Sequence, residues 1–161
     1  MSLHAAGEDH WAHRLLEIPW VYGCSQQLFA PGATVAVTRA IRRLLQRLPP
    51  ARTIVDVGCG PSSWLKRVGL QPVGVDRSWP YVARYGHGAR AVMALADALP
   101  FASRSVDAVW SFFLFHHVPD DVARTAVSEM LRICRPGGSV VVCDGVMPRS
   151  AWRRPIASLN Y

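Results

Sequence analysis

The chain has 161 residues, half of them apolar, and a formal net charge of +7. This length and apolar content favour one compact domain and require no second one. No stretch reaches about 18 uninterrupted apolar residues, and the amino terminus lacks a continuous apolar core, so we expect neither a membrane span nor secretion but a cytoplasmic protein.

The positive charge comes from seventeen arginines and one lysine against eleven acidic residues. Neutralisation of nucleic-acid phosphates depends on such side chains. The arginines are scattered, however, and the dense group Arg42, Arg43 and Arg47 lies on a predicted helix whose other face is apolar. We interpret it as a solvated helix face and do not expect a nucleic-acid partner.

The amino-terminal part predicts two helices. Residues 8–18 look helical and stop at Pro19, and residues 33–48 repeat apolar residues at helical spacing before two prolines end the run. We assign residues 1–50 to a helical lid, 51–147 to a cofactor-binding domain and 148–161 to a tail.

A ligand-facing turn follows the first predicted strand. The apolar run from Ile54 breaks at Gly58 and Gly60, and a second apolar run ends at Asp76. Glycines let the main chain approach a ligand closely, and a carboxylate can accept hydrogen bonds from the two hydroxyls of a ribose. This pattern is typical of a nucleoside-binding half-fold.

Strands and helices alternate from residue 54 onward. This alternation predicts an α/β fold, a doubly wound Rossmann-like parallel sheet with helices on both faces and its ligand at the carboxyl ends of the strands. The expected strands are 54–58, 72–76, 91–94, 106–110 and 139–143, and the expected helices run to residue 68, from 79 to 85 and from 120 to 134.

Three later segments complete a set of five motifs: Asp97-Ala98, residues 105–111, and residues 129–142 with a Pro-Gly-Gly turn. In this order and spacing the motifs resemble those of class I S-adenosylmethionine-dependent methyltransferases, especially the methyltransferase type 11 branch. The resemblance runs from about Ile54 to Asp144. It implies S-adenosylmethionine as the cofactor.

The resemblance also implies roles for individual residues. The turn from Asp56 through Gly58 to Gly60 would meet the amino-acid end of the cofactor, and Asp76 its ribose. The other implied contacts are Asp97 and Ala98 at the adenine edge, Ser111 and Phe112 at the methionine part, Arg77 stacked on the adenine or simply solvated, and Tyr22 as a lid residue or a packing residue.

One position departs from the family pattern. Many members carry a third glycine where this chain has Ser62, preceded by Pro61. A dinucleotide fold needs that glycine to close a helix terminus on a pyrophosphate, whereas S-adenosylmethionine has no phosphate. The change therefore counts against a nicotinamide dehydrogenase, and Pro61 suits a first helical turn.

His116 and His117 follow the fourth predicted strand, near the expected position of the methyl group. Either imidazole is a candidate general base at neutral pH, with a structural role as the alternative. A metal site formed by both histidines and Asp120 is disfavoured, and no metal is predicted; Asp120 is expected to cap the following helix.

Family members normally continue with a helix and two more strands. Only residues 145–161 follow Asp144, so we expect the sheet to lack its last two strands, in a fragment or in a shortened relative. The fifth strand would then be an apolar edge. A folded-back tail or a second copy, giving a homodimer, is expected to cover it.

The leading functional interpretation is a methyltransferase for a small, apolar or aromatic acceptor. The alternatives are an RNA or protein methyltransferase and a non-catalytic partner protein that retains cofactor binding. Methyl transfer requires mainly that the acceptor is aligned with the methyl group, and a general base is needed only if the acceptor must lose a proton.

Overall fold

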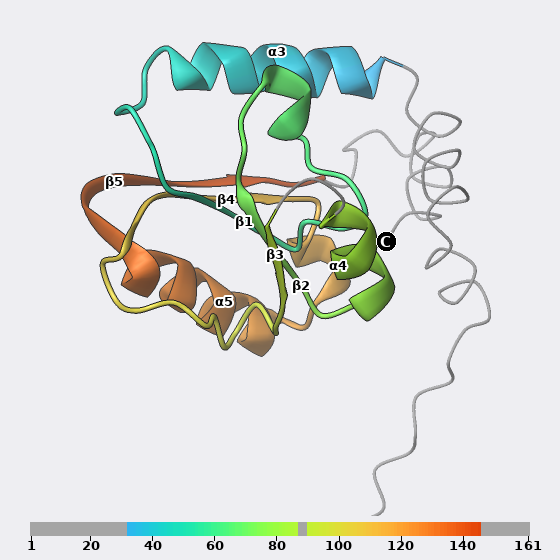
Figure 1. Ribbon diagram of the computed structural model, residues 1–161, viewed down its shortest axis with the longest axis vertical. Coiled ribbons are helices and arrows are strands. Elements are labelled where there is room, and N and C mark those ends of the chain that lie inside the picture. Colours follow the sequence, from blue (N-terminus) through green and yellow to red (C-terminus); the bar gives the residue numbers. More distant parts are fainter. Residues whose placement is uncertain (1–31, 87–89, 146–161) are drawn as a thin grey trace, which may run out of the picture.

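Five parallel strands form the sheet at the centre of the computed structural model, which describes residues 32–86 and 90–145 (Figure 1). The strand order is β3-β2-β1-β4-β5, as the alternating pattern predicts. The strands are β1 (Ile54–Val57), β2 (Val73–Asp76), β3 (Ala91–Met93), β4 (Val106–Phe112) and β5 (Cys134–Cys143).

Helices cover both faces of the sheet (Figure 1), so every residue of β1 is buried. On one face, Val55 and Val57 pack in a core cluster with Met130 and Ile133 of α5 (Asp120–Ile133). On the other face, Ile54 packs with residues of α3 and β4. An apolar run without alternation is the expected signature of such a two-sided burial.

The helix α3 (Ala33–Leu45) is one of these covering layers. Its Ile41 is 1% exposed and shares a core cluster with Ala108 and Trp110 of β4. Residues 33–45 of the predicted lid therefore contribute to the core of the α/β fold itself. The predicted helix at 8–18, Tyr22 and the tail from residue 148 lie outside the described residues.

The predicted helix between the glycine turn and Val68 is wrong. The chain from Pro61 to Leu65 is irregular, and only the short 3-10 helix η1 (Lys66–Val68) follows it. Ser63 explains the difference, because its hydroxyl donates to Asp56 Oδ2 at 2.5 Å and accepts from Leu65 N at 3.1 Å. Such local side-chain bonds compete with helical backbone bonds.

The second helix of the cofactor half, α4 (Trp79–Tyr85), has the predicted bounds. It packs on β2 where Gly74 leaves room for the Tyr85 ring: a Cβ at Gly74 would lie 2.6 Å from Tyr85 Cε1. Gly74 therefore lets helix and sheet approach closely.

The strand β5 begins at Cys134, earlier than predicted, because Cys134 pairs with Val106 before a register shift that ends at Ser139. Gly138 lies in this irregular stretch, against the main chain of Asp107. The Asp107 carboxylate accepts from Arg52 N at 2.6 Å and Thr53 N at 2.8 Å, and pairs with Arg135 Nε at 2.8 Å. It thus joins the starts of three strands.

Within the described residues β5 is an outer strand of the sheet, and Val142 is 46% exposed. Cover by a tail or by a second copy of the chain stays a prediction. Among residues 32–86 and 90–145, no helix combines the length and apolar character needed to cross a bilayer.

Neighbouring residues of α5 allow a matched test of the core. Met130 is fully buried whereas Leu131 is 59% exposed. We expect Met130→Ala to lower the free energy of unfolding by about 2–5 kcal/mol, since it leaves a cavity, and Leu131→Ala to change it by about 0.5 kcal/mol or less. Urea unfolding measures both, and equal losses would contradict this packing.

Candidate functional site

The glycine turn lies at the carboxyl ends of β1 and β2. Gly58 N and Cys59 N both donate to Val75 O, at 2.8 and 3.0 Å. Gly58 and Gly60 adopt φ angles of 68° and 58°, in the left-handed region that favours glycine. A Cβ at Gly60 would meet nothing within 4 Å, so the main chain there borders open space.

Asp76 connects this turn to the second strand. Its Oδ2 accepts from Gly60 N and its Oδ1 from Ser78 N, both at 2.9 Å. Each carboxylate oxygen has two acceptor positions, so each can accept one further hydrogen bond. Partial burial raises the pKa of Asp76, and the two amide bonds oppose that rise. Arg77 beside it is exposed.

Asp56 lies deeper than a ligand contact would. It is 2% exposed, and its Oδ2 accepts from the Ser63 hydroxyl. Burial raises the pKa of Asp56 to about 7, against the opposing hydrogen bond from Ser63. The structure thus shows Asp56 supporting the turn from inside, and its contact with a cofactor stays a prediction.

The single lysine of the chain, Lys66, follows the same turn at the start of η1. Lys66 Nζ donates to Tyr85 O at 2.9 Å and lies 4.0 Å from the centre of the Tyr85 ring. This contact joins η1 to α4, and nothing in the sequence pattern indicated it.

The loop carrying Asp97 and Ala98 follows β3, next to the end of β2. Ala94 N donates to Asp76 O at 3.1 Å, which places the start of this loop beside Asp76. Asp97 is half-buried and Ala98 exposed, so both predicted residues lie at the expected edge of the sheet.

A paired Glu129 and Arg132 on α5 hold this loop. Leu99 N donates to Glu129 Oε2 at 2.8 Å, while Arg132 donates to Leu99 O at 3.0 Å and to Phe101 O at 2.8 Å. The two side chains also pair with each other, with 2.6 Å between Arg132 Nε and Glu129 Oε1. Both residues are in the fifth motif, but the motif pattern does not indicate that they hold the loop after β3.

After the end of β4, the residue that contacts the glycine turn is Leu114, whereas Ser111 and Phe112 were the predicted site residues. Ser111 is fully buried, its Oγ without a hydrogen-bond partner among the described residues, and Phe112 is 6% exposed. Phe113 has a φ of 56°, a conformation rare for a residue with a side chain. Leu114 then packs on Gly58, where a Cβ would lie 2.9 Å from Leu114 Cδ1.

The two histidines follow the end of β4, on the short 3-10 helix η2 (Phe115–His117). Their rings are 3.9 Å apart between centroids, His116 is half-buried and His117 is exposed. His116 Nδ1 lies 2.5 Å from Oδ1 of Asp144, which directly follows β5. Sequence reasoning missed Asp144, because its partner is distant along the chain.

Asp120 does not cap α5. The helix begins at Asp120 itself, with Pro119 as the capping residue and no side-chain hydrogen bond at the cap. In the described part of the chain, no three His, Cys, Asp or Glu side chains gather as metal ligands would.

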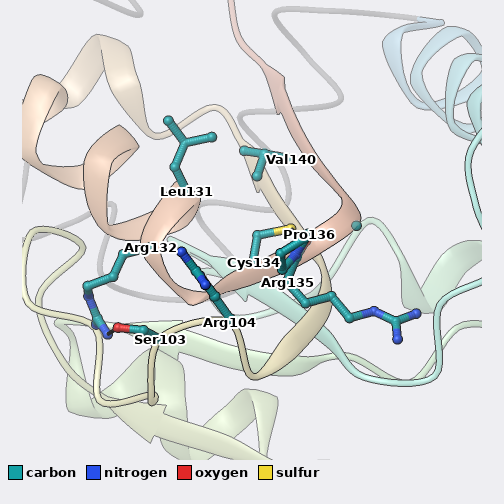
Figure 2. A pocket seen from close by; sticks show the side chains of 9 residues that line it. Ser103, Arg104, Leu131, Arg132, Cys134, Arg135, Pro136 and Val140 are labelled. Atoms are coloured by element: carbon teal, nitrogen blue, oxygen red, sulfur yellow. Dashed lines mark hydrogen bonds between the residues drawn. The ribbon is translucent and has the colours of Figure 1, made fainter.

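A depression of about 810 Å³ lies at the opposite end of the sheet (Figure 2). It is lined by residues just before β4, at the end of α5 and at the start of β5, among them Arg104, Leu131 and Arg135. In open α/β sheets ligands bind at the carboxyl ends of the strands. The depression is therefore separate from the glycine turn and Asp76, although residues of the fifth motif line it.

Comparison with known proteins agrees with this geometry. Residues 55–142 match the family model described as a methyltransferase domain. The chain is 34% identical over 128 residues to the 2-methyl-6-phytyl-1,4-hydroquinone methyltransferase of Synechocystis, covering 70% of this chain and 40% of that one. It is also 34% identical over 106 residues to the probable tRNA methyltransferase 9B of Homo sapiens, covering 63% and 23%.

The fold has a solved counterpart in a Thermotoga maritima protein described as a S-adenosylmethionine-dependent methyltransferase, with a TM-score of 0.70 at 22% identity, over 90% of this chain and 67% of that one. The chain belongs to the methyltransferase domain family, in the class I S-adenosylmethionine-dependent group, with S-adenosylmethionine as its cofactor. It spans less than half the length of the curated relatives named above.

Substitutions at Gly58 and Gly60 distinguish backbone strain in the turn from a side-chain collision. Both substitutions to Ala place a Cβ in the left-handed region, at a cost of about 1–2 kcal/mol, but only at Gly58 does it also collide with Leu114. We expect Gly58→Ala to lower the melting temperature more than Gly60→Ala. Leu114→Ala should lower stability less when it is introduced into the Gly58→Ala variant than when it is introduced into the wild type, because it removes the colliding side chain. If the losses of the two substitutions simply add, the contact is contradicted.

The raised pKa of Asp56 predicts that the stability of the protein depends on pH. Its folded-state pKa of about 7 lies above the unfolded value near 3.9, so the folded state binds more protons between these values. Its contribution to stability is therefore present below about pH 4 and is lost as pH rises to about 7. Asp56→Asn should reduce the fall in unfolding free energy between pH 5 and pH 8.

The matched control for this measurement is Asp121→Asn, which removes an exposed carboxylate from the first turn of α5. It should retain the wild-type pH dependence. The same slope in Asp56→Asn as in the control would show that Asp56 does not titrate in this range.

Proposed function

We propose that the protein is a methyltransferase that transfers the methyl group of S-adenosylmethionine to a small aromatic or apolar acceptor. The observation that carries this proposal is the geometry of Asp76, whose carboxylate lies against the amide of Gly60 at the shared end of β1 and β2. Main chain and carboxylate meet there at one ligand-facing edge.

The described residues fit the cofactor. Asp76 has acceptor capacity for two ribose hydroxyls, and the open space over Gly60 suits a ligand lying on bare main chain. In this proposal Gly58 and Gly60 hold the amino-acid end, while Asp97 and Ala98 border the adenine. The hydroxyl of Ser111, which has no hydrogen-bond partner among the described residues, is a further polar group near the end of β4.

Bound S-adenosylmethionine supplies a sulfonium methyl group that is already an activated electrophile. The protein's task is then to hold an acceptor atom in line with that group and to exclude water. The strand-end loops that the carboxylates of Asp76 and Glu129 fix suit this positioning role.

Aromatic side chains at the end of β4 support an apolar acceptor. The half-buried rings of Trp64 and Phe113 lie 5.8 Å apart between centroids. Leu114 packs on Gly58, and Leu114 and Phe115 pack against the core cluster on the α5 face of the sheet. The relative from Synechocystis is named for a hydroquinone, which is an aromatic acceptor.

A tRNA acceptor is the second candidate. It is supported by the relatives named as tRNA methyltransferases and by a row of exposed arginines on and just after α3, namely Arg39, Arg42, Arg43 and Arg47. Arginine side chains of this kind suit phosphate contacts.

Calorimetric titration with S-adenosylhomocysteine tests the cofactor site. We expect Asp76→Ala to weaken binding about 10- to 100-fold, since hydrogen bonds to a charged group contribute about 1.5–3 kcal/mol. Asp121→Asn, which removes an exposed carboxylate from the first turn of α5, should bind as the wild type does. Unchanged affinity in Asp76→Ala would contradict the assigned ribose contact.

Transfer of a radiolabelled methyl group then distinguishes the acceptors. The proposal expects label in 2-methyl-1,4-hydroquinone or in extractable small molecules of a cell extract, and Asp76→Ala should reduce it by at least tenfold at limiting cofactor. Label confined to tRNA or to protein would favour the corresponding alternative. Cofactor binding without any transfer would favour a non-catalytic binding protein.

A further inference from the structure

The loop between β3 and β4 is attached to other elements at both of its ends. At its start Ala94 N donates to Asp76 O at 3.1 Å, and at its end Ser105 N donates to Ile133 O at 2.8 Å. Residues 97–98, which the proposed function places at the adenine, lie between these two attachments. Their position relative to the cofactor therefore depends on what holds the middle of the loop.

The middle of the loop is held by Glu129 and Arg132 of α5. Leu99 N donates to Glu129 Oε2 at 2.8 Å, and Leu99 O accepts from Arg132 Nη2 at 3.0 Å. Arg132 Nη1 also donates to Phe101 O at 2.8 Å. Both main-chain polar groups of Leu99 thus bond to one pair of side chains, which fixes the place and the orientation of the residue directly after Ala98.

The pair is itself arranged as a rigid unit. Arg132 donates to Glu129 through two nitrogens, from Nε to Oε1 at 2.6 Å and from Nη2 to Oε2 at 2.8 Å. The hydrogen bond from Arg132 holds the pKa of Glu129 below its usual value, and the Leu99 amide lowers it further, so Glu129 is ionised at neutral pH. The Arg132 and Glu129 side chains are 34% and 19% exposed, and such partly exposed ion pairs contribute little to overall stability. The position of the loop is therefore the larger consequence of the pair.

The chemistry of the adenine edge determines what this loop can recognise. An ionised carboxylate only accepts hydrogen bonds. On the edge of an adenine joined to ribose, the ring nitrogens accept and only the 6-amino group donates. A carboxylate of Asp97 at this edge must therefore meet the 6-amino group, whereas a 6-oxo group in the same place would set two acceptors against each other.

We propose that Glu129 and Arg132 are positioning residues for cofactor selection. By holding Leu99 they keep the Asp97 carboxylate against the 6-amino group, so that the protein selects a 6-aminopurine over a 6-oxopurine cofactor. This rests on the proposed contact of Asp97 with the adenine and adds the residues that act through it. Hydrogen bonds weaken steeply when their geometry is lost, and a site built around such a bond rejects the analogue that lacks the matching group.

The ribose contact does not depend on this pair of side chains. Asp76 accepts from Gly60 N and Ser78 N, and neither of these bonds involves α5. Release of the loop should therefore lower the selectivity between purines more than it lowers the affinity for the nucleoside as a whole. A purely structural role would lower the affinities for both purines alike.

Calorimetric titration of the full chain with S-adenosylhomocysteine and with S-inosylhomocysteine, which carries a 6-oxo group, measures this selectivity. We expect the wild type to prefer S-adenosylhomocysteine by about 10- to 100-fold, the range for one hydrogen bond to a charged group. Glu129→Ala and Arg132→Lys should each reduce the preference to about threefold or less, since misaligned hydrogen bonds are weak. Arg132→Lys keeps the charge beside Glu129, but a lysine lacks the planar fork that bonds the carboxylate and two carbonyl oxygens together. A preference close to that of the wild type in either variant overturns the proposal.

Two controls distinguish positioning from a general loss of structure. Asp107 is a matched case at the opposite end of the sheet, since it also accepts two backbone amides and pairs with an arginine, Arg135. Asp107→Ala should lower the melting temperature and keep the wild-type preference. Adding Glu129→Ala to Asp97→Ala should not lower the preference further, because Glu129 acts through Asp97. A further loss in the double variant, or a reduced preference in Asp107→Ala, indicates a structural role and overturns the proposal.

The same titrations separate this proposal from the proposed function. A wild type that binds neither compound contradicts the cofactor site itself. A wild type that binds both compounds equally contradicts the contact of Asp97 with the 6-amino group and, with it, this proposal. A selective wild type whose selectivity persists in Glu129→Ala or Arg132→Lys contradicts the positioning role alone and leaves the proposed function intact.

Discussion

The hydrogen bond from Gly60 N to Asp76 Oδ2 is the constraint on which the carboxyl-end edge of the sheet depends. It joins the turn after β1 to the end of β2, and the bonds from Gly58 N and Cys59 N to Val75 O secure the same junction. The junction requires the parallel register in which Val57 pairs with Val75. Without that register the glycines and the acid would not meet, so packing of the sheet core determines the geometry of the site.

Carboxylates fix each of the loops at this edge. Asp76 accepts from the glycine turn, Glu129 from Leu99 in the loop after β3, and Asp144 from the segment after β4. Each accepts a backbone amide, so a loop's position depends on a side chain from another element. Hydrogen bonds to charged acceptors are stronger than those between neutral groups, which makes this a suitable way to hold irregular chain in a defined place.

The strands and α4, α5 and most of α3 were predictable because apolar runs and helical periodicity are local signals. The irregular segment after Gly60 was not, because the hydroxyl of Ser63 pairs with Asp56, and no periodicity shows such a bond. The same limit explains the depth of Asp56, the contact of Lys66 with Tyr85 and the pairing of His116 with Asp144. Motif spacing located the ends of the strands, but which side chains meet there depended on contacts between distant residues.

Asp56 shows how stability and site geometry oppose each other in this fold. Burial raises the pKa of this carboxyl group to about 7, so keeping it ionised inside the protein is unfavourable. An apolar residue would fill the space without that cost but would offer no acceptor to Ser63, whose hydroxyl also accepts from Leu65 N. The chain from Pro61 to Leu65 would then lose the bond that holds it out of a regular helix. An unfavourable buried group next to the glycine turn is the kind of local conflict expected at a functional site rather than in a purely structural core, which agrees with the proposed role of this turn.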